Sequence, residues 1–323
     1  MNLLLVTVDA SHIRRIVPQV MEEMQELGGY RCRLVHDYAP NLKHRLWTLG
    51  LPTTVVSFCL LRWFNPPWAR VWSQVDLDKI QEYRVLEHAG LPVPKWEPLT
   101  EGAEPDLSSF GEHVVVKPAS GIRGALVRVM RRNKVRWERQ EIRCFNVVSE
   151  AMVVQEYVHT GPRPVSFRVA TVFGEPIYAL RITASRNRPP ITFNGTNGSR
   201  AFDGKTIVAS SKGCTMDEEV PQEVVELARR AHTAFPTVPV LGSDIVRDCR
   251  TGQLYVLEVN AVGSAFHLDS IRARQFKEQF GIDLSLQFGG VNAVARGIHR
   301  RLCQANEKSS RRNGIRIHES ASG

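Results

Sequence analysis

The chain has few cysteines and lacks a long apolar run. Its cysteines stand at positions 32, 59, 144, 214, 249 and 303. Since no two have the Cys-x-x-Cys spacing, the sequence predicts neither a zinc site nor a disulfide framework. The most apolar stretch, Leu51–Phe64, contains Ser57 and Arg62 and is shorter than the roughly 20 residues that cross a bilayer. The N-terminus leads directly into a strand pattern, without the features of a secretory signal. We expect a cytoplasmic protein with reduced thiols and no membrane span.

Acidic residues are fewer than basic ones: the chain has 33 Asp and Glu residues and 42 Lys and Arg residues, which gives a net charge of +9. Many of the basic residues lie in a cluster, residues 128–143, and in a polar tail, residues 304–323, which we expect to be disordered. A basic cluster can bind nucleic acid, but no nucleic-acid-binding module accompanies this one. We interpret the cluster as a solvated face and expect no nucleic-acid partner. The same positive field would favour anionic substrates.

The size and pattern of the chain predict several structural units. A chain of 323 residues with 43% hydrophobic content can bury a large core and divides into two or three units. Residues 2–9 have the pattern of a buried strand, residues 16–27 that of a helix ending at a Gly-Gly pair, and residues 32–36 that of another strand. This alternation predicts a small α/β lobe with a parallel sheet over residues 1–75.

Three oxygen-bearing side chains occur late in the chain, on two apolar runs joined by the turn at residues 250–252. Asp244 lies in the first run, whereas Glu258 and Asn260 lie in the second. Because strands project alternate residues to one side, Glu258 and Asn260 point the same way. Hard divalent cations take oxygen ligands of this kind, together with waters and substrate phosphates. The pattern favours a magnesium site and hence a nucleotide, although an acidic hairpin end can also be merely solvated.

Two earlier segments have features suited to a nucleotide. A β-branched run ends at Lys117 and is followed by a turn with Gly121 and Gly124; glycines let backbone N–H groups approach phosphates, and the lysine adds a charge. Neither the Walker pattern nor the dinucleotide fingerprint is present, so an ordinary hairpin is the alternative. The strand at residues 151–158 could present backbone groups to an adenine edge, and its alternative is an unremarkable buried strand.

In this order, the three segments resemble the ATP-grasp superfamily of carboxylate–amine ligases, over residues 76–265. Residues 166–182 are similar to the corresponding stretch of bacterial glutathione synthetases and ribosomal-protein glutamate ligases. The resemblance implies an α/β protein of the α+β ATP-grasp type. The expected units are an N-terminal lobe (residues 1–75), a small subdomain with the phosphate lid (residues 76–150) and a subdomain with the metal site (residues 151–303). The nucleotide would be sandwiched between the last two.

The resemblance also implies roles for particular residues. The positions that would contact ATP are Lys79, Lys117, Gly121, Gly124, Gln155, Glu156, Tyr157 and Val158. Those that would hold phosphate or the substrate carboxylate, or close over the reaction centre, are Arg168, Arg181 and Asn197. Those that would bind two Mg²⁺ ions, with Mn²⁺ as an alternative, are Asp244, Glu258 and Asn260. For each arginine taken alone, a surface ion pair is the favoured explanation.

The chain departs from the family pattern at several positions. Ser166 stands where the family has Asp in Asp-x-Arg, and Ile122 and Leu126 replace a serine and a glycine of the lid. We interpret the chain as a divergent, active member, with a degenerate ATP-binding relative as the alternative.

The expected activity is an ATP- and Mg²⁺-dependent carboxylate–amine ligase that forms an amide or peptide bond through an acyl phosphate. Its substrate would be an amino acid or short peptide with a carboxylate, its co-substrate an amine, and its oligomeric state a possible homodimer. The alternatives are an ATP-grasp kinase acting on a small molecule and a non-catalytic nucleotide- or nucleic-acid-binding relative.

Overall fold

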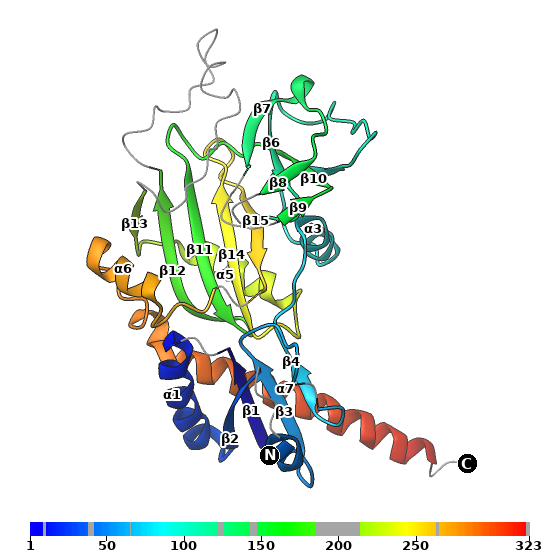
Figure 1. Ribbon diagram of the computed structural model, residues 1–323, viewed down its shortest axis with the longest axis vertical. Coiled ribbons are helices and arrows are strands. Elements are labelled where there is room, and N and C mark those ends of the chain that lie inside the picture. The colour runs from blue at the N-terminus through cyan, green and yellow to red at the C-terminus, as the bar shows by residue number, and fades with distance from the viewer. Residues whose placement is uncertain are drawn as a thin grey trace.

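The structure is a computed structural model of the chain. It describes residues 1–8, 11–37, 42–64, 66–121, 126–142, 147–184, 214–262 and 265–320. In this part of the chain the strands form three main sheets and a short ribbon, with helices packed against them (Figure 1). None of the described helices is both long and apolar enough to span a bilayer. This mixed α/β architecture is the fold class that the sequence predicted.

The first sheet is parallel and lies near the N-terminus. Its order is β2-β1-β3-β4, and every strand pair in it is parallel. The strands are β1 (Asn2–Thr7), β2 (Arg31–His36), β3 (Thr53–Ser57) and β4 (Arg70–Trp72), and the helices of this region are α1 (Ser11–Gly28) and α2 (Leu42–Trp47). Strand β1 is buried along its whole length, as expected for the centre of a parallel sheet covered on both faces. The predicted N-terminal parallel sheet is thus confirmed.

The second sheet is antiparallel, with the order β5-β10-β6-β7. Its strands are β5 (Trp96–Leu99), β6 (His113–Pro118), β7 (Arg128–Arg131) and β10 (Met152–Glu156). Near it lie the short helix η1 (Arg132–Lys134) and the ribbon of β8 (Gln140–Ile142) and β9 (Val147–Ser149). The segment at residues 152–156 therefore belongs to the same sheet as Lys117. The chain passes from this sheet to the third sheet after Glu156.

The third sheet is the largest, with the order β13-β12-β11-β14-β15. Its strands are β11 (Val165–Val172), β12 (Glu175–Thr183), β13 (Thr215–Asp217), β14 (Val240–Arg247) and β15 (Leu254–Asn260). Helix α5 (Gln222–Thr233) packs on one face, where it shares a buried cluster with Phe167 and Val169. Helix α7 (Gly290–Ser320) packs on the other face, which Ala170 and Val172 line. The remaining elements are α6 (Ile271–Phe280) and η3 (Gln287–Gly289).

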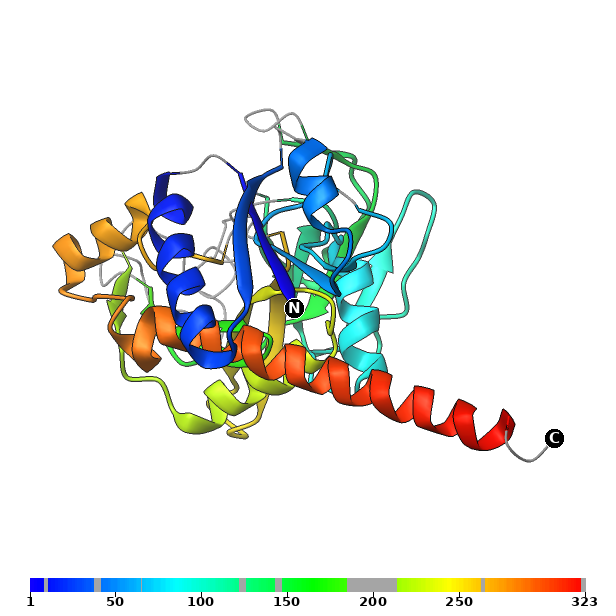
Figure 2. The same ribbon diagram turned by 90° about the horizontal axis from the view of Figure 1, so that it is seen from below.

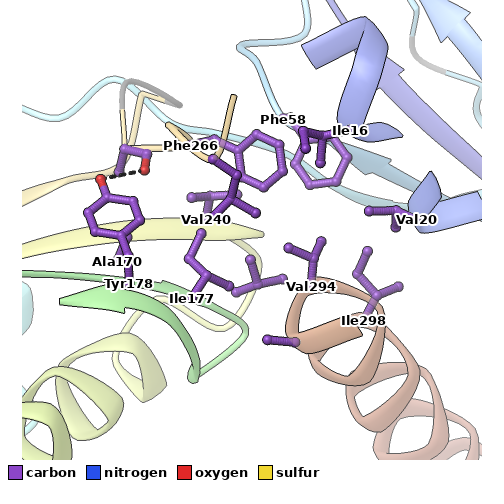
Figure 3. Close-up of a cluster of buried hydrophobic side chains, with 14 of the residues drawn as sticks. Ile16, Val20, Phe58, Ala170, Ile177, Tyr178, Val240, Phe266, Val294 and Ile298 are labelled. Atoms are coloured by element: carbon purple, nitrogen blue, oxygen red, sulfur yellow. Dashed lines mark hydrogen bonds between the residues drawn. The ribbon is translucent and has the colours of Figure 1, made fainter. Parts of the chain in front are cut away.

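One buried apolar cluster joins the N-terminal sheet to the third sheet. Ile16 and Val20 of α1 and Phe58 after β3 meet Ile177 of β12 and Val294 of α7 in it (Figure 3). Because this cluster is continuous, the N-terminal lobe and the third sheet share a core and are held together by apolar burial.

Residues 304–320 continue helix α7, which corrects the expectation of a disordered tail. Figure 2 shows this end of α7 extending past the rest of the molecule. No proline interrupts residues 304–320, and most of them are Gln, Ala, Glu, Lys, Arg or Ser, several of which are strong helix formers. Since the first turns of α7 are anchored by Ala293, Val294 and Ile298 in the shared core, the helix is nucleated there and propagates outward.

Candidate functional site

Lys117 lies at the end of β6 with its amine turned into the protein. The Lys117 Nζ donates to Tyr83 Oη at 2.6 Å, to Gln155 Oε1 at 3.2 Å and to the Leu257 carbonyl at 3.4 Å. The residue is 5% exposed. Burial lowers the pKa of Lys117 to about 8, although the charge of Glu258 opposes the shift. All three N–H donors of the amine are thus used within the protein, so an anion bound nearby would interact with its charge, or would replace the longest of these contacts, at a site screened from water.

Lys79 reaches the same region from the first turn of α3 (Lys79–His88). The helix starts there because Asp78 caps it, its side chain accepting from Gln81 N at 2.8 Å in a capping box. The Lys79 Nζ donates to the Gly121 carbonyl at 3.4 Å and lies 3.8 Å from Glu258 Oε1. Two lysines from different elements thus converge near one carboxylate.

Glu82 also faces this region, and the sequence did not single it out. It lies one helical turn after Lys79 and is 7% exposed. Its carboxylate accepts from the backbone N–H of Val259, and burial, reinforced by the charge of Glu258, raises the pKa of Glu82 well above its usual range. Its spacing of three residues from Lys79, which places both on one helix face, was the signal that could have found it.

Arg168, Asp244 and Glu258 form a row across the third sheet. In the register of the sheet, Arg168 of β11 stands opposite Asp244 of β14, which stands opposite Glu258 of β15. Register partners point to the same face, so the three side chains share it. The Arg168 guanidinium donates to Asp244 through Nε to Oδ1 and through Nη2 to Oδ2, each at 2.7 Å. This bidentate pairing with Asp244 raises the pKa of Arg168.

Asn260 lies two residues after Glu258, opposite Gly242 in the register. A Cβ at position 242 would lie 2.7 Å from Ala265 Cβ and 3.5 Å from Asn260 Cβ. The contact with Asn260 would be ordinary, whereas the contact with Ala265 would be a clash. Glycine at position 242 therefore leaves the space that Ala265 occupies beside this strand pair.

The three predicted metal ligands have a donor set that suits a hard cation. Asp244 and Glu258 supply carboxylate oxygens and Asn260 an amide oxygen, the ligand types that Mg²⁺ prefers. No cluster of three or more His, Cys, Asp or Glu residues suited to a metal occurs within the described residues. Both Asp244 oxygens accept from Arg168, yet each retains a further lone pair. The residues therefore fit Mg²⁺ bound also by waters and phosphates.

Arg181 is not brought to this row. Leu180 is the register partner of Arg168, and Arg181 is that of Phe167, so Arg181 points to the opposite face of the sheet. Its guanidinium lies 3.8 Å from the carboxylates of Asp217 and of Glu219. These contacts are the ion pairs of a partly exposed surface arginine.

The predicted adenine segment begins in the second sheet and ends in the connection to the third sheet. Gln155 and Glu156 are the last residues of β10, and Tyr157 and Val158 follow that strand. Gln155 is 2% exposed and contacts Lys117. The Glu156 Oε1 accepts from Gly111 N at 3.2 Å, and Glu156 N donates to the Lys95 carbonyl at 2.8 Å. Tyr157 and Val158 are half-buried, and burial raises the pKa of Tyr157 to about 12.

The two remaining predicted residues, Gly124 and Asn197, lie outside the described residues. The other lid glycine, Gly121, is half-buried and accepts from Lys79 through its carbonyl. The site that the structure describes is therefore the junction of α3, β6, β10, β11 and the β14–β15 pair. It combines two lysines, an arginine, carboxylates and an amide, a set suited to binding phosphates together with a hard cation.

Comparison with known proteins identifies the family of this chain. The family model described as an ATP-grasp domain matches residues 77–262. The sequence has no match among curated proteins. Among solved structures, the D-cycloserine synthetase DcsG matches with 16% identity over 94% of this chain and 100% of its own, at a TM-score of 0.50, which indicates a similar fold. The ATP-grasp ligase PsnB matches with 16% identity over 93% and 99% of the two chains, at a TM-score of 0.49. The D-alanine–D-alanine ligase of Bacillus anthracis matches with 14% identity over 94% and 99%, at a TM-score of 0.46.

Proposed function

The chain belongs to the ATP-grasp family, and we propose that it is an ATP- and Mg²⁺-dependent ligase that joins a carboxylate to an amine. One observation carries the proposal: Lys79, Lys117 and Glu258 converge from three separate elements. A cationic pair beside a carboxylate row is what a bound triphosphate and its metal ion require.

The nucleotide would lie between the β6–β10 sheet and the β14–β15 pair. Lys79 and Lys117 would contact its phosphates, and the backbone near Tyr157 and Val158 would contact adenine. Lys117 suits this role because its amine is buried, and a charge interacts more strongly with phosphate where water is excluded.

Asp244, Glu258 and Asn260 would hold magnesium. When bound, Mg²⁺ would neutralise charge on the phosphates. Arg168 fixes the Asp244 carboxylate through two hydrogen bonds, and its remaining N–H donors can contact an anionic substrate group.

The reaction would proceed in two displacements. An oxygen of the substrate carboxylate attacks the γ-phosphorus of ATP, the bond from that phosphorus to the β,γ-bridging oxygen breaks, and ADP leaves as an acyl phosphate forms. The amine then attacks the acyl carbon, inorganic phosphate leaves, and the amine nitrogen loses a proton. Alignment and neutralisation of charge suffice for these steps, so no protein nucleophile is required. The resemblance of residues 166–182 favours an amino acid or short peptide as substrate.

The test is ADP formation by the purified protein with ATP, Mg²⁺ and a panel of amino acids and dipeptides. A ligase forms ADP only when both a carboxylate and an amine are present. ADP formed with the acid alone, together with a stable phosphorylated product, identifies a kinase instead. Absence of ADP formation across the panel, with tight binding of nucleic acid, would support a non-catalytic role.

A pair of matched variants ties the activity to this site. Glu258→Gln removes the carboxylate beside Lys79 and should abolish ADP formation. Glu278→Gln makes the same change at an exposed position of α6 and should leave ADP formation as in the wild type. Wild-type turnover by Glu258→Gln would refute the assignment of this site.

A further inference from the structure

Tyr83 has a fully buried hydroxyl that contacts three other segments. It belongs to α3 and is 0% exposed. Its Oη donates to the Leu257 carbonyl at 2.6 Å, and it accepts from Lys117 Nζ at 2.6 Å and from Gln155 Nε2 at 2.8 Å. One donor and two acceptor positions of a hydroxyl are thereby all used. The contacts join α3 to β6, β10 and β15.

These hydrogen bonds include a closed ring. Lys117 Nζ donates to Gln155 Oε1 at 3.2 Å, Gln155 Nε2 donates to Tyr83 Oη, and Lys117 also donates to Tyr83. The ring determines the orientation of the Gln155 amide, because the opposite orientation would bring its NH₂ group against the lysine amine. It also restricts the amine of a long, flexible side chain to one location, since all of its acceptors are fixed.

The Leu257 carbonyl is available to this hydroxyl because of a β-bulge. Asp244 pairs with Glu258, but the next residue of β14 pairs with Val256, so Leu257 has no register partner. A bulged residue is left out of the ladder, and here its carbonyl accepts from Tyr83 and Lys117 instead. Leu257 immediately precedes Glu258, so the hydroxyl contacts the strand of the proposed metal ligands.

Packing alone does not account for a tyrosine at this position. The ring packs against Trp96, with centroids 5.2 Å apart, and a phenylalanine would fill the same space. A buried hydroxyl that lacks partners destabilises the fold, so the three partners are what make tyrosine suitable here.

We propose that Tyr83 is a positioning residue that holds the Lys117 amine for phosphate binding and couples it to the strand that carries Glu258. The inference rests on the proposed function, because it assumes that Lys117 contacts nucleotide phosphate. Tyr83 itself need not touch the nucleotide. Its effect is therefore expected on the phosphates and not on adenosine.

The test is a double-mutant cycle on nucleotide binding by the full-length protein. The variants are Tyr83→Phe, Lys117→Met and the double variant, each titrated with Mg-ATP and separately with adenosine. Tyr83→Phe should weaken ATP binding about tenfold, as expected for the loss of a hydrogen bond to a charged group, with adenosine binding unchanged. In the Lys117→Met background, Tyr83→Phe should have no further effect on ATP.

Tyr30→Phe is the matched control. Tyr30 is also buried, and its hydroxyl bonds His299 Nδ1 at 2.9 Å in another part of the molecule. Its removal should change neither ATP nor adenosine binding. If Tyr83→Phe fails to fold, Gln155→Leu breaks the same ring from the opposite side and should give the same selective loss of ATP binding.

Three results would overturn the inference while leaving the proposed function intact. These are wild-type ATP affinity in Tyr83→Phe, equal weakening for ATP and adenosine, and effects of Tyr83→Phe and Lys117→Met that simply add. Failure of the wild-type protein itself to bind Mg-ATP would instead refute the proposed function, and with it the premise of the inference.

Discussion

Replacement of Lys117 by methionine should weaken nucleotide binding and yet stabilise the unliganded protein. The amine is buried, and burial lowers its pKa from the ordinary 10.5 to about 8. At about 1.4 kcal/mol per pKa unit, the charged form costs the folded state about 3 kcal/mol. Methionine has a similar length and avoids this cost.

Part of the gain is offset by hydrogen bonds that the variant loses. The Tyr83 hydroxyl keeps two partners, but Gln155 Oε1 loses its donor, at a cost of about 1–1.5 kcal/mol. The net gain in the free energy of unfolding at pH 7 should be about 2 kcal/mol, which corresponds to a rise of about 3 °C in the thermal midpoint.

The sign of the pH dependence follows from the lowered pKa of Lys117. Between pH 8 and 10.5 the unfolded chain holds a proton at this lysine that the folded protein lacks, so the wild type gains stability as pH rises through this range. Below pH 8 both states are protonated and the full cost applies. The advantage of Lys117→Met should therefore be greatest at pH 7 and close to zero at about pH 9.5.

Thermal unfolding of both proteins at the two pH values, without and with Mg-ATP, measures this effect. Because other titrating groups are common to both proteins, the difference between them isolates Lys117. Mg-ATP should stabilise the wild type more than the variant. A variant that is less stable than the wild type at pH 7, or an advantage that does not change with pH, would refute the reasoning.

Three further predictions concern the third sheet. Arg168→Ala should reduce ADP formation by tenfold or more, an effect of about 1.4 kcal/mol or larger on the barrier. Arg181→Ala, on the opposite face of the sheet, should retain most of the wild-type ADP formation. Similar losses in the two variants would argue against the assigned faces. Gly242→Ala should lower the free energy of unfolding by about 1–3 kcal/mol in a denaturant titration, because its Cβ would lie 2.7 Å from Ala265 Cβ; an unchanged midpoint would contradict this steric argument. Glu175→Gln should lower the free energy of unfolding by about 1 kcal/mol, because the Glu175 carboxylate, 10% exposed, lies 2.8–3.8 Å from three partly exposed arginines. An unchanged or raised thermal midpoint would count against it.

The parts of the site that the sequence predicts depend on local signals. Lys79 follows a helix cap, Lys117 ends a β-branched run, and Glu258 and Asn260 alternate on one strand. Each of these patterns determines which way a side chain points within its own element. Their order along the chain supports the resemblance to the ATP-grasp superfamily, and it was this resemblance that identified the elements expected to meet at the junction.

The parts that the sequence did not predict depend on contacts between elements. Tyr83 belongs to the site only because α3 packs beside β15, and a tyrosine in a helix gives no separate signal. Glu82 shares a helix face with Lys79, but only the packing of α3 shows that this face meets β15. The face of Arg181 depends on the register between β11 and β12, which is determined by long-range pairing. The helical state of residues 304–320 depends on anchoring of α7 in the shared core.

The most direct test of the central claim follows the oxygen atoms of the carboxylate. With a carboxylate substrate labelled with ¹⁸O, an amine and Mg-ATP, the two displacements should deliver one labelled oxygen into the inorganic phosphate for each amide formed. Labelled phosphate, seen by mass spectrometry in the wild type and absent in Glu258→Gln, is the predicted result. Amide formed with unlabelled phosphate, or no ADP formation with any carboxylate and amine, would contradict the account.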